Sequence, residues 1–246
     1  MKLLLQDKTM TLLPEKAIYL EDSEILLVAD THFGKSGTFR QAGVAVPKDS
    51  NTDGISRLER LIHRIKPKRC IILGDFFHSR LNQSWEEVAN WTRQQRDPVI
   101  ELVKGNHDVL GNTDYARAGI IVHEDYLDIE GFRLIHDADT QTAGSQKNAD
   151  ITNCTRTSDE STGITSKSDD GAIFTISGHL HPGIRMKGYA RQSMMLPCFH
   201  LNNNGCILPA FGTFTGLAEV RVTSESRTFV PIPQDNIVLE ITRKSR

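Results

Sequence analysis

Three features are scarce in this sequence, and each scarcity narrows the class of protein. No apolar run approaches the length that a membrane span needs, and residues 1–7 turn polar too early for a signal peptide, so we expect no membrane partner. The four cysteines show no CxxC spacing, which argues against a zinc knuckle or a disulfide framework and favours a reduced, cytoplasmic setting. The formal charge of −2 supplies no global basic field, so a charged substrate must be held by local positive charge, metal ions included.

The length and the pattern of the chain favour one domain. With 246 residues the chain can bury a sizeable core, and we find neither an internal repeat nor an interdomain linker, so we expect a single domain over residues 1–246. Short apolar runs late in the chain, at residues 196–199, 208–212 and 236–241, predict a set of antiparallel strands.

Strands and helices alternate along the first half of the chain. Residues 2–28 alternate short apolar runs with polar pairs, which predicts strands in a hairpin or meander. Residues 25–29 and 70–73 are continuously apolar and residues 99–103 are apolar except for Glu101, which predicts three buried strands. The segments between these runs have helical spacing, so the first half has the βαβ rhythm of a mainly parallel sheet.

Polar side chains follow each of the three buried strands directly. Asp30 and His32 follow the first strand, Asp75 follows the second, and Asn106, His107 and Asp108 follow the third. Taken singly, each cluster is also compatible with a turn or a helix cap. Because open α/β sheets bind ligands at the carboxyl ends of their strands, three such clusters together indicate a site.

Further histidines come later in the chain. A short strand over residues 132–135 ends at His136, and an apolar run at 172–177 leads into His179 and His181. Polar residues dominate the stretch 137–170 between them. Such a composition cannot bury enough apolar surface to offset the entropy of ordering, so we expect an exposed, flexible insertion.

Seven oxygen or nitrogen donors now stand in the sequence, with no thiolate among them: Asp30, His32, Asp75, Asn106, His136, His179 and His181. Seven ligands are too many for one tetrahedral ion and suit two ions that share a bridging carboxylate. Mixed imidazole, carboxylate and amide donors favour Mn²⁺, Fe²⁺ or Zn²⁺ over Mg²⁺ or Ca²⁺. We therefore expect two divalent ions, with Mn²⁺ first among the three. A structural single-metal site stays open, but it would not explain why His107 and Asp108 adjoin Asn106.

The order Asp-x-His, Gly-Asp, Gly-Asn-His-Asp, His, Gly-His-x-His over residues 30–181 resembles that of the calcineurin-like metallophosphoesterase superfamily. The resemblance implies an α/β (α+β) fold, a β-sandwich of two mixed sheets flanked by helices in four αββα layers. It implies that one ion is held by Asp30, His32, Asp75 and His181, and the other by Asp75 as the bridge, Asn106, His136 and His179. It also implies that His107 is the general acid and that Asp108 holds it.

Flanking segments resemble more narrowly the bacterial ligase-associated DNA damage response endonuclease family (PdeM), which is related to the SbcD nucleases. They lie within about residues 10–220, at 29–35, 39–43, 46–47, 181–185, 196–199 and 208–212. This resemblance implies a DNA or other phosphodiester substrate, with a DNA ligase and a helicase as partners. Two features depart from the family. His136-Asp137-Ala138 stands where members tend to have His-Glu-Pro, and the stretch 137–170 borders His136 and could alter substrate access.

The sequence thus predicts a dinuclear metal-dependent phosphodiesterase, a DNA endonuclease in DNA repair. In the mechanism that we expect, a metal-bridged hydroxide attacks in line and His107 protonates the leaving oxygen. Candidate phosphate contacts are Lys35, Arg40 and Arg185, each equally compatible with an ordinary surface charge. His78 is added because related nucleases have a histidine near the active site at that place. We interpret Arg57, Arg60 and Arg64 as a solvated helix face.

Two other functions stay open at this point. A phosphatase or phosphodiesterase of nucleotides or other small phosphoesters would need no strong basic balance, and the chain has none. A non-catalytic scaffold of the same fold would be expected to lose the acid or some ligands, whereas both are complete here.

Overall fold

The computed structural model describes residues 1–35, 50–77, 83–138, 173–188, 192–213 and 215–242. Nearly all of the predicted insertion at 137–170 lies outside these ranges, as do Arg40 and His78. Within them, no helix has both the length and the apolar character that crossing a membrane requires.

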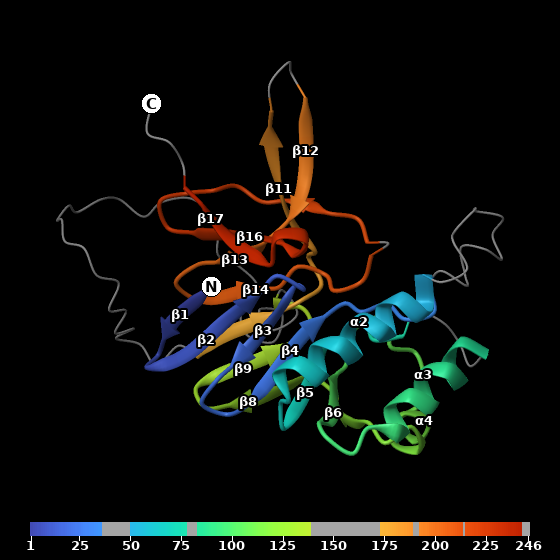
Figure 1. Cartoon of the computed structure of the whole chain (residues 1–246). Helices are drawn as coiled ribbons and strands as arrows, with labels where there is room; N and C mark the ends of the chain where they lie inside the picture. The colour runs from blue at the N-terminus through green and yellow to red at the C-terminus, as the bar shows by residue number, and fades with distance from the viewer. Residues whose placement is uncertain (36–49, 78–82, 139–172, 189–191, 214, 243–246) are drawn as a thin grey trace, which may run out of the picture.

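The first sheet has seven strands in chain order (Figure 1). They are β1 (Lys2–Leu5), β2 (Lys8–Leu13), β3 (Ala17–Leu20), β4 (Ile25–Ala29), β5 (Arg69–Leu73), β6 (Val99–Val103) and β7 (Ile121–His123). The pairs from β1 to β4 are antiparallel, and the pairs from β4 to β7 are parallel. Every residue of β4 is buried, as a continuously apolar strand requires. The predicted meander and the three predicted central strands are confirmed.

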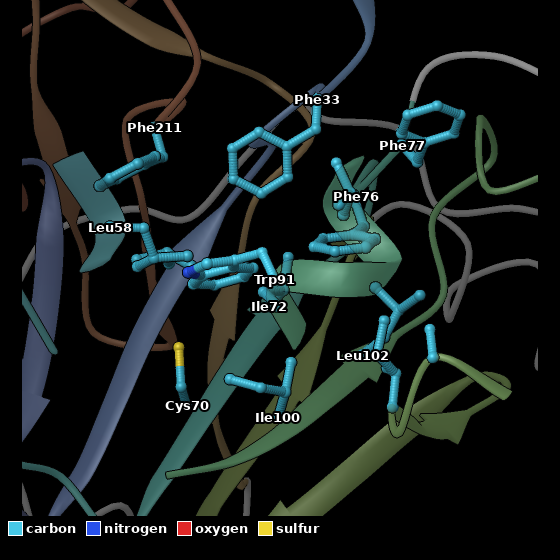
Figure 2. Packing of buried hydrophobic residues seen from close by; sticks show 14 of the residues in the cluster. Phe33, Leu58, Cys70, Ile72, Phe76, Phe77, Trp91, Ile100, Leu102 and Phe211 are labelled. Atoms are coloured by element: carbon cyan, nitrogen blue, oxygen red, sulfur yellow. The ribbon is translucent and has the colours of Figure 1, made fainter. Parts of the chain in front are cut away.

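Helices cover one face of this sheet: α2 (Ser50–Ile65), α3 (Gln83–Gln94) and α4 (Asn112–Arg117). In α2 the buried side chains recur at helical spacing, with Leu58, Leu61 and Ile62 at most 4 % exposed. Figure 2 shows Leu58 and Trp91 from the helices near Ile72 and Ile100 of the sheet, members of one apolar cluster. This cluster fixes the helix layer against the strands that end at the polar clusters.

The second sheet lies against the other face of the first. Its order is β17-β16-β13-β14-β10-β9-β8, with β14, β10 and β9 parallel. The strands are β8 (Tyr126–Ile129), β9 (Phe132–Ile135), β10 (Phe174–Ser177), β13 (Phe199–Leu201), β14 (Gly205–Ile207), β16 (Arg227–Ile232) and β17 (Ile237–Ile241). A second apolar cluster joins Leu27 and Ile71 of the first sheet to Phe132, Phe199 and Phe229 of the second. The predicted β-sandwich of two mixed sheets is confirmed.

A small third sheet follows the order β12 (Ser193–Pro197), β11 (Pro182–Lys187), β15 (Ala218–Glu219). Its Ile184 joins Cys198 and Val230 in a third apolar cluster next to the second sheet. After α4 the described residues form no α-helix, although a short 3-10 helix, η3 (Pro233–Asp235), precedes β17. In the part of the chain that is described, strands rather than helices therefore extend the sandwich beyond the second sheet.

One late segment does not form the strand that its apolar residues predict. Residues 208–212 are a largely buried loop, and their backbone N–H groups bond to the ends of β10 and β4 and to the loop after β4. Leu208 donates to Ser177 O at 2.8 Å and Phe211 donates to Ala29 O at 2.8 Å. Pro209 has no N–H to give to a strand ladder, so burial here comes from loop packing.

Candidate metal centre

The predicted ligands lie at the ends of strands from both large sheets. Asp30 and His32 follow β4, Asp75 follows β5, and Asn106 follows β6 in the first sheet. His136 follows β9, and His179 and His181 follow β10 in the second sheet. Parallel strands place their carboxyl ends at one edge, so two parallel sets deliver ligands from both sides of the sandwich.

Two groups of side chains have the spacing of metal ligands. Asp30, His32 and His181 form one group, and Asp30, Asp75 and His136 form the other, with ligand atoms within 4.8 Å of one another in each. His181 Nε2 lies 3.3 Å from Asp30 Oδ1, and His136 Nε2 lies 3.4 Å from Asp75 Oδ1. The other oxygen of Asp75, Oδ2, is 3.8 Å from His32 Nε2, so this carboxylate spans the two histidines.

Asn106 and His179 complete the set around His136. Asn106 Oδ1 is 3.0 Å from His136 Nε2, and His179 Nδ1 is 3.1 Å from the same nitrogen. The backbone N–H of His179 also donates to both oxygens of Asp30, at 3.2 and 3.0 Å. All seven ligands that the sequence nominates therefore lie in one connected cluster.

The loops that carry these ligands continue the pairing of their strands. Asp30 N donates to Gly74 O at 3.2 Å, and His32 N donates to Asp75 O at 2.9 Å. Five ligand residues have left-handed backbone conformations: Asp30 (φ 51°), His32 (46°), Asp75 (50°), His179 (65°) and His181 (50°). Each such residue costs about 1–3 kcal/mol, so the surrounding structure must hold these loops in place.

Glycine allows the closest approach in the centre. Gly74 has a φ of +71°, and a Cβ added there would lie 2.1 Å from Nδ1 of His136 and 2.3 Å from its Cγ. Gly178 is equally confined, because a Cβ there would lie 2.6 Å from Asp30 Oδ2. The missing side chains leave room for the imidazole of His136 and the carboxylate of Asp30.

Comparison with known proteins agrees with this geometry. Residues 23–192 match the family described as calcineurin-like phosphoesterase. The chain belongs to this family. Its members are metal-dependent phosphoesterases, and the chain is therefore an enzyme of that class.

Solved structures extend the likeness to the whole chain. The crystal structure of Pseudomonas putida nuclease MPE is 25 % identical, with a TM-score of 0.68, and the alignment covers 98 % of this chain and 99 % of that one. A predicted phosphoesterase from Streptococcus pneumoniae is 13 % identical, with a TM-score of 0.31, over 89 % of this chain and 97 % of that one. A protein of unknown function from Aquifex aeolicus is 19 % identical, with a TM-score of 0.38, over 64 % and 78 %. No curated protein matches the chain.

The donor set fits the divalent metals that phosphoesterases of this family use. His136 Nδ1 lies 3.1 Å from Leu73 O, which can only accept, so with the proton on Nδ1 the ring would present the Nε2 lone pair to a metal. That lone pair faces the oxygens of Asn106 and Asp75. In addition, the buried Nε2 of His181 has no hydrogen-bond partner among the described residues. Imidazole nitrogens that converge on two buried carboxylates form a donor set that fits a divalent cation.

His107, the predicted acid, lies at the exposed rim of the centre. Its backbone N–H donates to Asp75 Oδ1 at 3.0 Å, and its ring centroid is 6.2 Å from that of His32. Asp108 beside it is buried, and its carboxylate accepts hydrogen bonds from the backbone N–H groups of Gly105, Phe76 and Phe77 and from the Tyr115 hydroxyl. These bonds tie the loop after β6 to the loop after β5, so Asp108 fixes the backbone that carries His107.

Of the predicted phosphate contacts, Lys35 and Arg185 are described by the structure, and their surroundings differ. Burial lowers the pKa of Lys35, against the opposing effect of the charges on Asp75 and Asp30, so its ammonium group lies within electrostatic reach of both carboxylates. Arg185 is on β11 and makes a bidentate pair with Glu219. Arg40 and His78 lie outside the described residues.

One neighbour of the ligands was not predicted to take part. Asp137 Oδ2 lies 3.8 Å from His179 Nε2, on the side of the ring opposite to the nitrogen that faces His136. A carboxylate at this position can orient a ligand histidine and raise its basicity. The one sequence signal for this role of Asp137 is its position directly after the predicted ligand His136. In the sequence, Asp137 is otherwise notable only as a departure from the narrower family.

Proposed function

We propose that the chain is a two-metal phosphodiesterase that cleaves DNA, and that it acts as an endonuclease in DNA repair. The observation that carries this proposal is the likeness to a nuclease over almost the full length of both chains, together with the cluster of the seven predicted ligands at the strand ends. A nuclease needs a site that accepts a phosphate within a polymer. Asn106 and His107 are both exposed, so the ligand cluster is open to solvent on this side.

We assign the following roles to the residues of the site. Asp30, His32 and His181 would hold one ion, and Asp75, Asn106, His136 and His179 the other, with Asp75 between them. When bound, two divalent ions activate water near neutral pH and offset the charge that builds up on the phosphate oxygens. His107 would give its proton to the leaving sugar oxygen, a contribution of about 10²–10⁴-fold in rate. Lys35 would add positive charge beside the phosphate.

Mn²⁺ is the metal that we propose first, with Fe²⁺ or Zn²⁺ as alternatives, since imidazole, carboxylate and amide donors suit all three. The narrower family resemblance supports a DNA ligase and a helicase as partners. We place the protein in the cytoplasm. The free thiols of Cys70, Cys198 and Cys206 are consistent with a reduced compartment.

The test of substrate class uses one enzyme preparation and four substrates. Single-stranded DNA, duplex DNA, bis-p-nitrophenyl phosphate and p-nitrophenyl phosphate are compared in the presence of Mn²⁺. We expect internal cleavage of DNA and hydrolysis of the diester, with little turnover of the monoester. Hydrolysis of the monoester alone would assign the chain to the small-molecule phosphatases, and no turnover with bound metal would favour the scaffold function.

The acid is tested through its leaving group. His107→Asn should retain both metals, because Asn106, His136 and His179 remain. Its rate should fall about 10²–10⁴-fold on DNA but little on bis-p-nitrophenyl phosphate, whose phenolate departs without a proton. His63→Asn, at an exposed position of α2, is the control and should behave like the wild type. Equal losses on both substrates, or loss of a metal, would overturn the assignment.

A further inference from the structure

The loop of residues 208–212, which we call the bridging loop, lies directly against the loop of residues 30–32 after β4. We call this second loop the ligand loop, because it carries Asp30 and His32. Phe211 N donates to Ala29 O at 2.8 Å, and Gly212 N donates to Asp30 O at 3.0 Å. A Cβ on Gly212 would lie 3.0 Å from both Asp30 O and Thr31 O, so the two backbones are in close contact. The Phe211 ring belongs to the apolar cluster beneath the helices and lies near Phe33 and Leu58 in Figure 2. The bridging loop therefore joins the ligand loop to the helix side of the core.

Two cations bind the carbonyl groups of the bridging loop. Lys16 Nζ, from the turn between β2 and β3, donates to Ala210 O at 2.7 Å and to Gly212 O at 3.2 Å. Arg57 Nη2, from α2, donates to Phe211 O, and the Arg57 guanidinium lies 4.1 Å from the centre of the Phe211 ring. Arg57 was predicted to lie on a solvated helix face. That prediction is wrong, because its guanidinium turns inward to this loop.

The hydrogen bonds on the two sides of the loop share peptide groups. The peptide that joins Ala210 to Phe211 accepts from Lys16 through its oxygen and donates to Ala29 through its N–H. The next peptide accepts from Arg57 and donates to Asp30 in the same way. A charged donor on a carbonyl strengthens the hydrogen bond that the N–H of the same peptide makes. Each cation thus acts on the ligand loop through a single peptide group.

The ligand loop needs such support because Asp30 and His32 both have left-handed backbone conformations. We propose that Lys16 and Arg57 are positioning residues that hold Asp30 and His32 ready to bind metal. The inference rests on the metal site of the proposed function. Burial also lowers the pKa of Lys16 to about 8, with the neighbouring charge of Arg57 acting in the same direction. Two neighbouring cations with this desolvation cost would be a poor choice for packing alone.

The variants are Lys16→Met and Arg57→Met, which keep much of the side-chain length and remove the donors. Lys16→Arg and Arg57→Lys are the conservative partners. Arg64→Met is the matched control on the same helix, since Arg64 pairs with Glu15 at the surface. Gly212→Ala perturbs the same contact through the backbone and leaves both cations in place.

The readout is Mn²⁺ affinity, measured by calorimetry on metal-stripped protein whose cooperative melting has first been verified. Outer residues that support metal ligands typically change affinity 10- to 100-fold, and we expect a loss of about that size for both methionine variants and for Gly212→Ala. The conservative variants should recover most of the affinity, and Arg64→Met should match the wild type. Saturating Mn²⁺ should restore kcat in the methionine variants.

Three outcomes separate the possibilities. Variants that melt earlier without metal but bind Mn²⁺ as tightly as the wild type would show a purely structural role and overturn the inference. If a methionine variant fails to fold, the conservative variants and Gly212→Ala decide the question by the same measurement. If the wild type itself binds no Mn²⁺, Fe²⁺ or Zn²⁺, the proposed function fails, and the inference fails with it.

Discussion

Gly74→Ala is the sharpest single test of the metal centre, because it inserts one methyl group against a ligand that it does not replace. The new Cβ would lie 2.1 Å from His136 Nδ1 and 2.7 Å from His136 Cβ, so the whole imidazole must move. The φ of +71° adds a left-handed penalty of about 1–2 kcal/mol. Overpacking adds about 1–3 kcal/mol. We expect the variant to lose about 2–5 kcal/mol of stability in total.

Gly119→Ala separates the two contributions. Gly119 also has a left-handed φ, of +76°, but a Cβ there meets nothing within 4 Å. Gly119→Ala should therefore lose only the backbone penalty of about 1–2 kcal/mol, which lowers Tm by about 2–8 °C in a chain of this size. Only Gly74→Ala should also bind Mn²⁺ more weakly, by about 10- to 100-fold, because only there is His136 displaced.

A second pair repeats the design without a left-handed residue. Gly178→Ala would place a Cβ 2.6 Å from Asp30 Oδ2, whereas Gly216→Ala again meets nothing within 4 Å. Melting followed by calorimetry with Mn²⁺ is run on all four variants. The reasoning is refuted if Gly74→Ala and Gly178→Ala bind Mn²⁺ as tightly as Gly119→Ala and Gly216→Ala.

Three further predictions concern single carboxylates. Asp75→Asn should weaken both metal sites and reduce hydrolysis more than His179→Asn, because the Asp75 oxygens reach both His32 and His136. Metal analysis that finds at most one ion per wild-type chain at saturating Mn²⁺ would contradict the dinuclear site. Asp108→Asn should lower both Tm and Mn²⁺ affinity, since its carboxylate holds backbone N–H groups of two ligand loops; unchanged affinity in calorimetry would limit its role to His107. Glu101→Gln should cost about 1–3 kcal/mol in urea unfolding at pH 7 and leave the kcat of the Mn²⁺ enzyme unchanged. Burial raises the pKa of Glu101, but hydrogen bonds from Arg69 and His123 outweigh burial and lower it. The stabilisation by Glu101 is therefore present above pH 4.5 and is lost as the pH falls below that value. If the wild type and Glu101→Gln still differ by the same free energy of unfolding in strong acid, the ion pair is refuted as the source of the difference.

The sequence predicted the strands that carry the ligands because burial on both faces leaves a local trace. β4 is continuously apolar, β5 is apolar after Arg69, and β6 is interrupted only by Glu101, and the polar cluster at each carboxyl end is visible without any knowledge of the fold. Parallel pairing of these strands is sufficient to bring Asp30, Asp75 and Asn106 to one edge. The ligand positions could therefore be predicted, although the distances between them could not.

Contacts between loops could not be predicted in this way, because they leave no local pattern in the sequence. Residues 208–212 are as apolar as a strand, but they are buried against the ligand loop and the helix side of the core. Arg57 has the spacing of an exposed helix position, yet it contacts Phe211, which is 154 residues away in the chain. Asp108 accepts hydrogen bonds from backbone N–H groups of two loops, which the motif did not predict, while its role in holding the imidazole of His107 stays a prediction. For the loop 208–212, for Arg57 and for the bonds from Phe76 and Phe77 to Asp108, the partner is distant in sequence, so periodicity and motif spacing carry no information about it.

The same loop contacts explain how one centre can draw ligands from two sheets. The ligand loops extend past the last paired residues of β4, β5 and β10 and take left-handed turns, which no strand ladder stabilises. Backbone bonds from Asp30 to Gly74 in the first sheet and from Gly178 to His136 in the second replace the missing ladder, and the bond from Gly212 to Asp30 joins the loop that follows β14 to the first sheet. The carboxylates of Asp30 and Asp75 add to these bonds by accepting from the backbone N–H groups of His179 and His107, so backbone and side-chain contacts together hold the loops. The core beneath the helices, the core between the sheets and the bridging loop therefore act together as the frame of the metal centre.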